Sequence, residues 1–319
     1  MIQWWCAAQT VAWSWRWTPY PGVWLFVLAL VACYAAIRRR ALANGADAQT
    51  LSRRLPCFAA GAVLLWIALD WPIGALGAGY LAWIHMVQFL LIAMAVPPLV
   101  LLGMPREAFP GRPSSVRGSA ESSGVRSPSP TASAREEDPP RGSRATRFLD
   151  HPLFALLAFN AVVVATHLPV VTDTLMASQW GSFLVDILWL GAGLLYWWPV
   201  VGPTSPRPGF TPLLRMGYLF ASMIFMTAPG AMITFSEFPV YGIYELAPRI
   251  GGFAALDDQR IAGLLMKVGG GAITWTAISI IFYRWQRDEK RIMDGELAAI
   301  TGAGRSTAGT AAAGGAGVQ

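Results

Sequence analysis

The sequence has few charged residues and few of the side chains on which most catalytic sites depend. Only 13% of its 319 residues are Asp, Glu, Lys or Arg, and it contains three histidines and three cysteines. No C-x-x-C pair, Walker loop or H-E-x-x-H motif occurs, so the usual signatures of a thiol redox site, an NTPase and a zinc protease are missing. The cysteines fall at different predicted depths, so no intramolecular disulfide is expected between Cys6, Cys33 and Cys57.

The chain contains long apolar blocks. Hydrophobic residues make up 55% of the chain, too many for an ordinary water-soluble protein. Seven blocks could each form a helix that crosses a hydrocarbon core about 30 Å thick. They run approximately over residues 17–37, 55–71, 79–102, 152–170, 180–200, 213–235 and 261–283. Their continuous apolar character favours helices over barrel strands, so we predict an all-α polytopic membrane bundle with seven transmembrane helices.

Basic residues alternate between the predicted loops. They gather in the first, third and fifth loops and after the last block, and cytoplasmic loops accumulate such residues. This pattern predicts an N-terminus outside the cytoplasm and a cytoplasmic C-terminus. The net charge of +6 then follows from topology, and nucleic acid is not an expected partner. Arg16 is the one basic residue before the first apolar block and no small-residue cleavage site is obvious, so no removable signal peptide is expected.

Composition divides the chain into four stretches. Residues 1–104 hold the first three predicted helices, and residues 148–291 hold the other four. The stretch between them, 105–147, is rich in Ser, Pro, Arg and Gly and is predicted to be a disordered cytoplasmic linker. Residues 292–319 are predicted to form a low-complexity cytoplasmic tail, disordered from Thr301 onwards.

Aromatic residues cluster ahead of the first apolar block. Amphipathic rings favour the boundary between membrane and water, so we interpret the cluster as a belt at the outer interface. A ligand platform is the alternative interpretation. The residues are Trp4, Trp5, Trp13, Trp15, Trp17 and Tyr20.

Four ionisable side chains stand out inside the apolar blocks, where such groups are costly and often mark a site. They are His85, His167, Asp186 and Lys267. In the predicted topology each lies within about 9 Å of the outer end of its helix. We therefore predict one polar site that opens to the outer face. The alternative is a set of separate structural roles, with each histidine bonded to a backbone carbonyl and an ion pair between Asp186 and Lys267.

Sulfur and imidazole lie close together in this region. Both are suitable ligands for Cu(I), and Met86 adjoins His85 in the sequence. The candidate copper ligands are His85, His167 and Met86. Met223 and Met226 share a helical face with Met216, and core packing is the favoured interpretation of that stripe.

An acidic string precedes the seventh predicted helix. Asp257, Asp258 and Gln259 are predicted either to cap the N-terminus of that helix or to overhang the polar site as an outer lid.

Five strings occur in order along the chain: W-I-H-M-V-Q-F-L-L from Trp83, H-P-L-F from His151, T-H-L-P from Thr166, G-L-L-Y-W-W-P from Gly193 and D-D-Q-R-I-A-G-L-L-M from Asp257. Together they resemble the CtaG-like cytochrome c oxidase assembly factors. The resemblance implies a non-enzymatic, multi-pass protein of the bacterial inner membrane whose partners are oxidase subunits and the bilayer. It also implies help with delivering copper to a haem–copper oxidase at the outer face.

Three positions depart from the pattern of that family. Its histidine motif usually reads H-M-x-Q-H, whereas residue 89 is Phe; Asp186 stands where another histidine is typical, and Lys267 where tryptophan is typical. A carboxylate is a poor ligand for Cu(I), so a scaffold without metal stays open beside copper delivery. A copper transporter that uses the methionine faces and an oxidoreductase with haem between His85 and His167 are further alternatives. We also predict that Asp186 and Lys267 form a compensating ion pair.

Overall fold

The computed structural model describes residues 3–109, 151–204, 209–252 and 254–314, with side chains as far as residue 297. Every regular element in these ranges is a helix, which confirms the all-α prediction. Most of the predicted 105–147 linker lies outside the described residues, and the division into four stretches stays a prediction.

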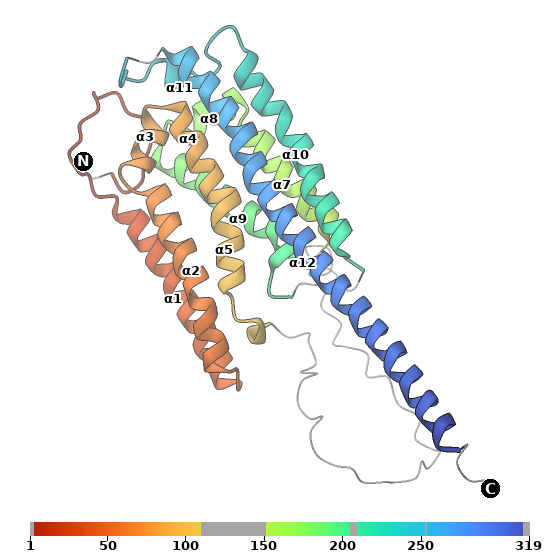
Figure 1. Cartoon of the computed structure of the whole chain (residues 1–319). Coiled ribbons are helices and arrows are strands. Elements are labelled where there is room, and N and C mark those ends of the chain that lie inside the picture. The colour runs from red at the N-terminus through yellow and green to blue at the C-terminus, as the bar shows by residue number, and fades with distance from the viewer. Residues whose placement is uncertain (1–2, 110–150, 205–208, 253, 315–319) are drawn as a thin grey trace.

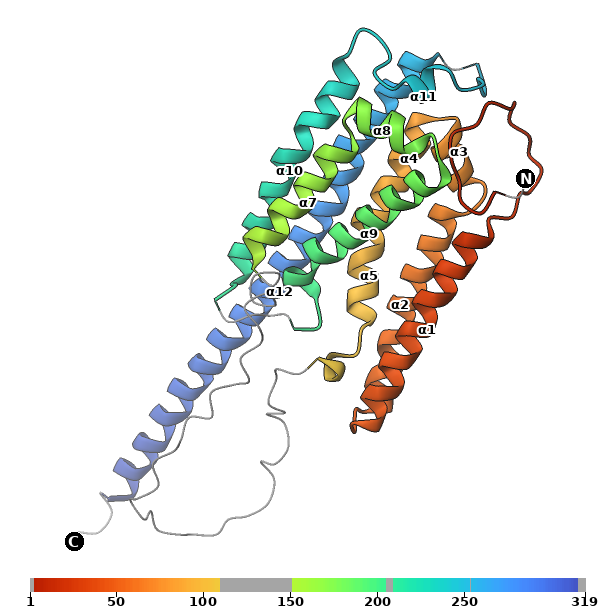
Figure 2. The ribbon, with the colours of Figure 1, turned by 180° about the vertical axis from the view of Figure 1, so that it is seen from behind.

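The first two long helices form an antiparallel hairpin at one edge of the bundle (Figures 1 and 2). Helix α1 spans Pro21–Ala43 and α2 spans Ala48–Leu69. Proline suits the first position of α1 because the N–H it lacks would have no helical partner there. At the start of α2, the Asp47 carboxylate accepts hydrogen bonds from the backbone N–H groups of Gln49 (3.3 Å) and Thr50 (2.8 Å).

The third span is one helix with a widened middle. It consists of α4 (Ala82–Phe89), a π-helical segment η1 (Leu90–Ala95) and α5 (Val96–Gly103). Consecutive prolines follow the π turn, at Pro97 and Pro98. Proline has no N–H and its ring crowds the carbonyl one turn earlier, and a π turn is one way to relieve that crowding.

The fourth span is bent. Helices α7 (Pro152–Thr166) and α8 (Pro169–Met176) meet at 74°, across a break that contains His167. Pro169 disfavours helical geometry in the residue before it, which accounts for the break.

Three long helices follow: α9 (Gln179–Val201), α10 (Pro212–Phe235) and α12 (Ala255–Gly314). Among the described residues, six helices are long and apolar enough to cross a membrane, and the bent pair of α7 and α8 brings the number up to seven. The chain is therefore a multi-pass helical bundle, and the predicted span count is met when the bent pair is one span.

Short elements gather at one end of the bundle. Helix α3 (Ile73–Gly79), α8, α11 (Gly242–Glu245) and the N-terminal segment lie there, and the α1–α2 turn and the far part of α12 lie at the other end (Figure 1). We call these the N-terminal end and the hairpin end. The arginine-rich hairpin end is the side that the charge pattern assigns to the cytoplasm.

Helix α12 is longer than the sequence analysis expected, at both ends. It begins at Ala255, so Asp257 and Asp258 lie in its first turn and Gln259 follows them inside the helix, instead of all three preceding it. It continues to Gly314, into the stretch from Thr301 for which disorder was expected. Alanine, the best helix former, is interspersed there with glycine, one of the poorest, so composition alone does not account for the continuation of the helix.

Candidate functional site

Two of the three histidines meet around one tryptophan. His85 on α4 and His167 at the α7–α8 bend are both buried. The Trp189 ring of α9 lies 5.0 Å from the His85 ring and 6.0 Å from the His167 ring, centroid to centroid. Its indole N–H donates to Thr166 Oγ1 at 2.9 Å, which fixes the ring. Phe89 completes the contact, 5.0 Å from His167 and 5.1 Å from Trp189.

Each of these imidazoles has a buried nitrogen without a partner. His167 Nδ1 lies 2.7 Å from the Val163 carbonyl oxygen, which can only accept, so Nδ1 carries the proton. In the neutral ring, Nε2 then has a free lone pair, and it has no hydrogen-bond partner. His85 Nδ1 is likewise buried and unpartnered. A backbone carbonyl on one ring nitrogen is the usual support for a histidine that binds metal through the other.

Asp186 joins the same region from α9. Its carboxylate accepts hydrogen bonds from Trp5 Nε1 at 2.8 Å and from Gln88 Nε2 at 3.3 Å. Gln88 follows His85 by three residues and therefore shares its helical face. We call His85, Gln88, His167, Asp186 and Trp189 the histidine cluster. Three of the four predicted intramembrane residues thus converge.

Lys267 does not belong to this cluster, and the predicted ion pair with Asp186 is wrong. The lysine is exposed, and its ammonium group donates to Thr227 Oγ1 on α10. Helix α12 packs on α10 and α4, so the side chain of Lys267 faces α10 and not Asp186 on α9.

The acidic string joins helices instead of forming a lid. Both carboxylate oxygens of Asp258 accept backbone hydrogen bonds at the start of α4, from Ala82 N and Trp83 N, each at 2.9 Å. These N–H groups have no partner inside their own helix. A cap on the helix that follows this string was predicted, but the helix that Asp258 caps is α4, not α12. Asp258 thereby holds the helix that carries His85.

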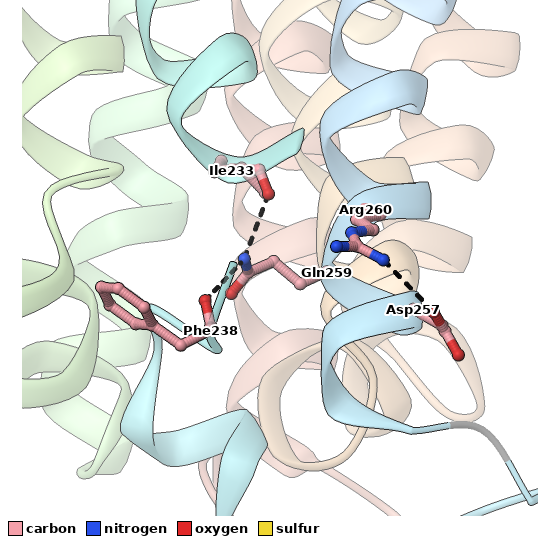
Figure 3. A network of polar contacts seen from close by, with 5 residues as sticks. All are labelled: Ile233, Phe238, Asp257, Gln259 and Arg260. Carbon is pink, nitrogen blue, oxygen red and sulfur yellow. Dashed lines mark hydrogen bonds and ion pairs between the residues drawn. The ribbon is translucent and has the colours of Figure 1, made fainter. Parts of the chain in front are cut away.

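The neighbours of Asp258 have different roles (Figure 3). Gln259 accepts from Val240 N at 2.7 Å and donates to the carbonyl oxygens of Ile233 (3.1 Å) and Phe238 (3.4 Å), so it ties α12 to the end of α10. Asp257 is exposed and lies 3.9 Å from Arg260.

The N-terminal segment contributes residues that the sequence analysis did not place in the site. Trp5 is 1% exposed, so its assignment to an interfacial belt is wrong, whereas Trp15 and Trp17 are exposed. The backbone N–H groups of Trp4 and Trp5 both bond to Gln179 Oε1, at 2.8 and 3.3 Å, which anchors the segment on α9. Nothing in the sequence distinguishes Trp5 from the other tryptophans of the cluster.

Tyr244 was missed as well. Its ring centroid lies 5.8 Å from that of His85, and its hydroxyl donates to the Gly77 carbonyl at 2.6 Å. Burial raises the pKa of Tyr244 well above its ordinary value, so the hydroxyl remains a donor at neutral pH. Tyr244 therefore links α11 to α3, which packs on α4 beside His85.

Cys6 lies near the cluster but is not a ready copper ligand. Burial raises the pKa of its thiol well above the ordinary value, and the nearby charges of Asp186 and Asp70 raise it further. The thiolate is the form that binds metal, so a thiol held protonated is a weak ligand.

The described residues contain no group of three or more His, Cys, Asp or Glu side chains placed to hold a metal ion. The histidine cluster offers two neutral imidazoles, which suit Cu(I) better than divalent ions that need more ligands. Met86 follows His85 in the sequence and is buried, but it lies about 100° further around α4.

The methionine stripe packs against α12. A Cβ at Gly270 would lie 3.1 Å from the Met226 methyl carbon, and one at Gly271 would lie 3.6 Å from that of Met223. The two thioethers thus fill the space that the α12 glycines leave, in agreement with the packing interpretation.

Replacing Trp5 by phenylalanine tests the anchor of the N-terminal segment. Loss of the indole N–H leaves a buried Asp186 oxygen without its donor, so we expect a loss of about 1–3 kcal/mol in the free energy of unfolding. Trp4→Phe is the control, since its indole does not contact the carboxylate, and should cost clearly less. Detergent unfolding followed by circular dichroism measures both, and equal losses would contradict the role of the Trp5–Asp186 bond.

Comparison with known proteins identifies the family of the chain. Residues 28–288, which include all five strings, match the model of a family described as cytochrome c oxidase caa3 assembly factor. An uncharacterized protein of Mycobacterium leprae is 25% identical over 249 residues, 75% of this chain and 35% of the relative. One from Mycobacterium bovis is 26% identical over 294 residues, 88% of this chain and 41% of the relative. The chain thus spans less than half the length of these curated relatives, and no solved structure matches it. The chain belongs to the caa3-type cytochrome c oxidase assembly factor family.

Proposed function

We propose that this protein assists assembly of a haem–copper oxidase by holding Cu(I) at the histidine cluster and passing it to an oxidase subunit. The observation that carries the proposal is the pair of buried, unpartnered ring nitrogens, His85 Nδ1 and His167 Nε2, on two rings that share Trp189 as a neighbour. A buried nitrogen lone pair without a partner is costly, and a soft metal ion would satisfy it.

The position of the cluster supports delivery at the outer face of a bacterial inner membrane. The elements that carry the cluster, α4, the α7–α8 bend and the first part of α9, lie toward the N-terminal end of the bundle, and the arginine-rich hairpin end lies opposite (Figure 2). Basic loops mark the cytoplasmic side, so the N-terminal end is the outer end in this proposal. The N-terminal segment would cover the bound ion, because Trp5 reaches the cluster through Asp186.

Copper binding is tested by competition with a chromogenic Cu(I) chelator, on purified protein in detergent under reducing conditions. We expect wild-type protein to bind Cu(I), and the His85→Ala/His167→Ala variant to bind at least about a hundredfold more weakly, since even outer-shell changes cost 10–100-fold in metal affinity. His151→Ala is the matched control because this exposed histidine caps α7 through its Nδ1, 3.3 Å from Leu153 N. Absence of wild-type binding, or unchanged binding by the double variant, would overturn the proposal.

A second candidate is an assembly scaffold that binds oxidase subunits without metal. Phe89 favours it, because an apolar ring contacts both His167 and Trp189 at the position where the family usually has histidine. Asp186 favours it too, since Trp5 and Gln88 already occupy its carboxylate. Oxidase subunits that co-purify equally with wild type and the double-histidine variant, together with no Cu(I) binding, would support this function.

A further inference from the structure

A groove runs between α1 and α2 near the hairpin end. Its volume is about 470 Å³. Tyr34 and Phe58 stack across it, with ring centroids 3.7 Å apart and an interplanar angle of 9°, and hold the two helices together. The Tyr34 hydroxyl donates to the Gly103 carbonyl at 3.3 Å, so the stack is also fixed to α5. The groove therefore has a rigid floor.

The walls of the groove are apolar and open to the surroundings. Val31, Leu42, Leu55 and Val63 line it, and all four are exposed. The hairpin lies at the edge of the bundle, and only 11% of the apolar window of α1 is buried by the rest of the protein (Figures 1 and 2). In a membrane this surface faces lipid chains.

Two arginines lie in the part of the groove nearer the hairpin end, which we call its mouth. Arg38 and Arg39 line it. Arg38 Nε is buried and has no hydrogen-bond partner, while one terminal nitrogen of the same side chain lies 3.5 Å from Ser52 Oγ. A buried guanidinium N–H without an acceptor leaves a donor available to a ligand.

The hairpin does not neutralise this charge itself. In the part of the chain that the structure describes, no carboxylate pairs with its five arginines, Arg38, Arg39, Arg40, Arg53 and Arg54. Asp47 is the only acidic residue of α1, α2 and their turn, and its carboxylate is bonded to the backbone at the start of α2. The groove mouth thus has a net positive charge that an external anion would balance.

We propose that this groove binds an anionic phospholipid. The phosphate lies against Arg38 and Arg39, and one acyl chain lies along the apolar walls between α1 and α2. Arginine suits phosphate because its planar N–H groups bond two oxygens at once. Basic pockets between transmembrane helices at the cytoplasmic surface are typical sites for anionic headgroups. An amphiphile matches the groove along its length, since the charge lies at its mouth and the apolar walls continue along α1 and α2.

Native mass spectrometry of the full-length protein, titrated with phosphatidylglycerol or phosphatidylcholine, tests the proposal. We expect a first phosphatidylglycerol to bind at least tenfold more tightly than phosphatidylcholine. The Arg38→Gln/Arg39→Gln variant should lose about 25-fold in affinity for phosphatidylglycerol, because each of the two basic residues near a charged surface contributes about fivefold.

Two further variants make the outcome specific. Arg40→Gln/Arg53→Gln removes the same charge from the same hairpin outside the groove, and should retain most of the affinity. Ala59→Trp fills the groove without changing charge, and should weaken binding even if the Arg38/Arg39 variant does not fold. Equal losses in the two double-arginine variants, equal binding of the two lipids, or unchanged binding in Ala59→Trp would overturn the proposal.

Discussion

Replacing Asp258 by alanine should destabilise the protein by about 3 kcal/mol. The carboxylate is 1% exposed and accepts hydrogen bonds from Ala82 N and Trp83 N, so its removal leaves two N–H groups at the start of α4 without acceptors. Each unsatisfied buried group costs about 1–3 kcal/mol, and loss of a helix cap alone costs about 0.5–2 kcal/mol. Unfolding in a denaturing detergent, followed by circular dichroism, measures the change.

The neighbouring aspartate provides the control. Asp257 is one residue away on α12 and equally charged, but it is exposed and its distance to Arg260 is 3.9 Å. Exposed ion pairs contribute about 0–1 kcal/mol, so Asp257→Ala should lower the free energy of unfolding by less than about 1 kcal/mol. Asp258→Asn keeps one acceptor oxygen, so its loss of stability should lie between those of Asp257→Ala and Asp258→Ala. If both alanine variants lose the same stability, the cap on α4 is not the role of Asp258.

A methyl group at Gly193 should also be strongly destabilising. At this position α9 crosses the π-helical part of the third span, and a Cβ would lie 2.3 Å from the Ala93 carbonyl oxygen and 2.7 Å from Pro97 Cγ. Backbone cannot yield as a flexible side chain does, so the helices must separate. We expect Gly193→Ala to cost about 2–3 kcal/mol, at the upper part of the range for overpacked cores.

Gly191 is the matched control on the same helix. It is exposed, and a Cβ there would meet nothing within 4 Å. Alanine favours helix over glycine by about 0.5–1 kcal/mol, so Gly191→Ala should leave stability unchanged or raise it. The same detergent unfolding applies to both variants. A destabilisation shared by both would point to a general need for flexibility in α9 instead of close packing on η1.

Both positions act on the histidine cluster through the backbone. Asp258 sets the start of α4, which carries His85 and Gln88. Gly193 sets the approach of α9, which carries Asp186 and Trp189, to the helix continuous with α4. The cluster therefore depends on contacts outside it, and neither contact is visible in the order of residues along the chain.

The sequence predicted the membrane-spanning helices more completely than the residues of the site. The apolar blocks located the membrane-crossing helices, but three helices extend beyond their blocks: α1 ends at Ala43 instead of residue 37, α2 begins at Ala48 instead of residue 55, and α12 begins at Ala255, before the block at Ile261. Polar residues such as Asp257 and Asp258 end an apolar block without ending a helix, because helix formation depends on backbone hydrogen bonds and the first turn accepts acidic residues well. Pro169 indicates a helix boundary near His167, and Pro97 and Pro98 indicate a distortion of the third span, but whether a proline causes a break, a kink or a π turn depends on the packing around it.

The site was predicted in part. Shared depth correctly brought together His85, His167 and Asp186, since residues at one depth on packed helices can meet. It failed for Lys267 because depth says nothing about which way a side chain faces around the bundle, and Lys267 faces Thr227 of α10. It also missed Trp5, which reaches the cluster from a segment without regular structure.

The sequence by itself determined that this chain is a helical membrane protein of the oxidase assembly family, because hydrophobic length and ordered motifs are local properties. Only the tertiary structure decided the partners: Asp186 bonds Trp5 instead of Lys267, Asp258 caps α4 instead of α12, and two imidazole nitrogens are left without partners. The physical reason is that a buried polar group is satisfied by whatever donor or acceptor packing brings within about 3 Å, and that distance is independent of separation along the chain.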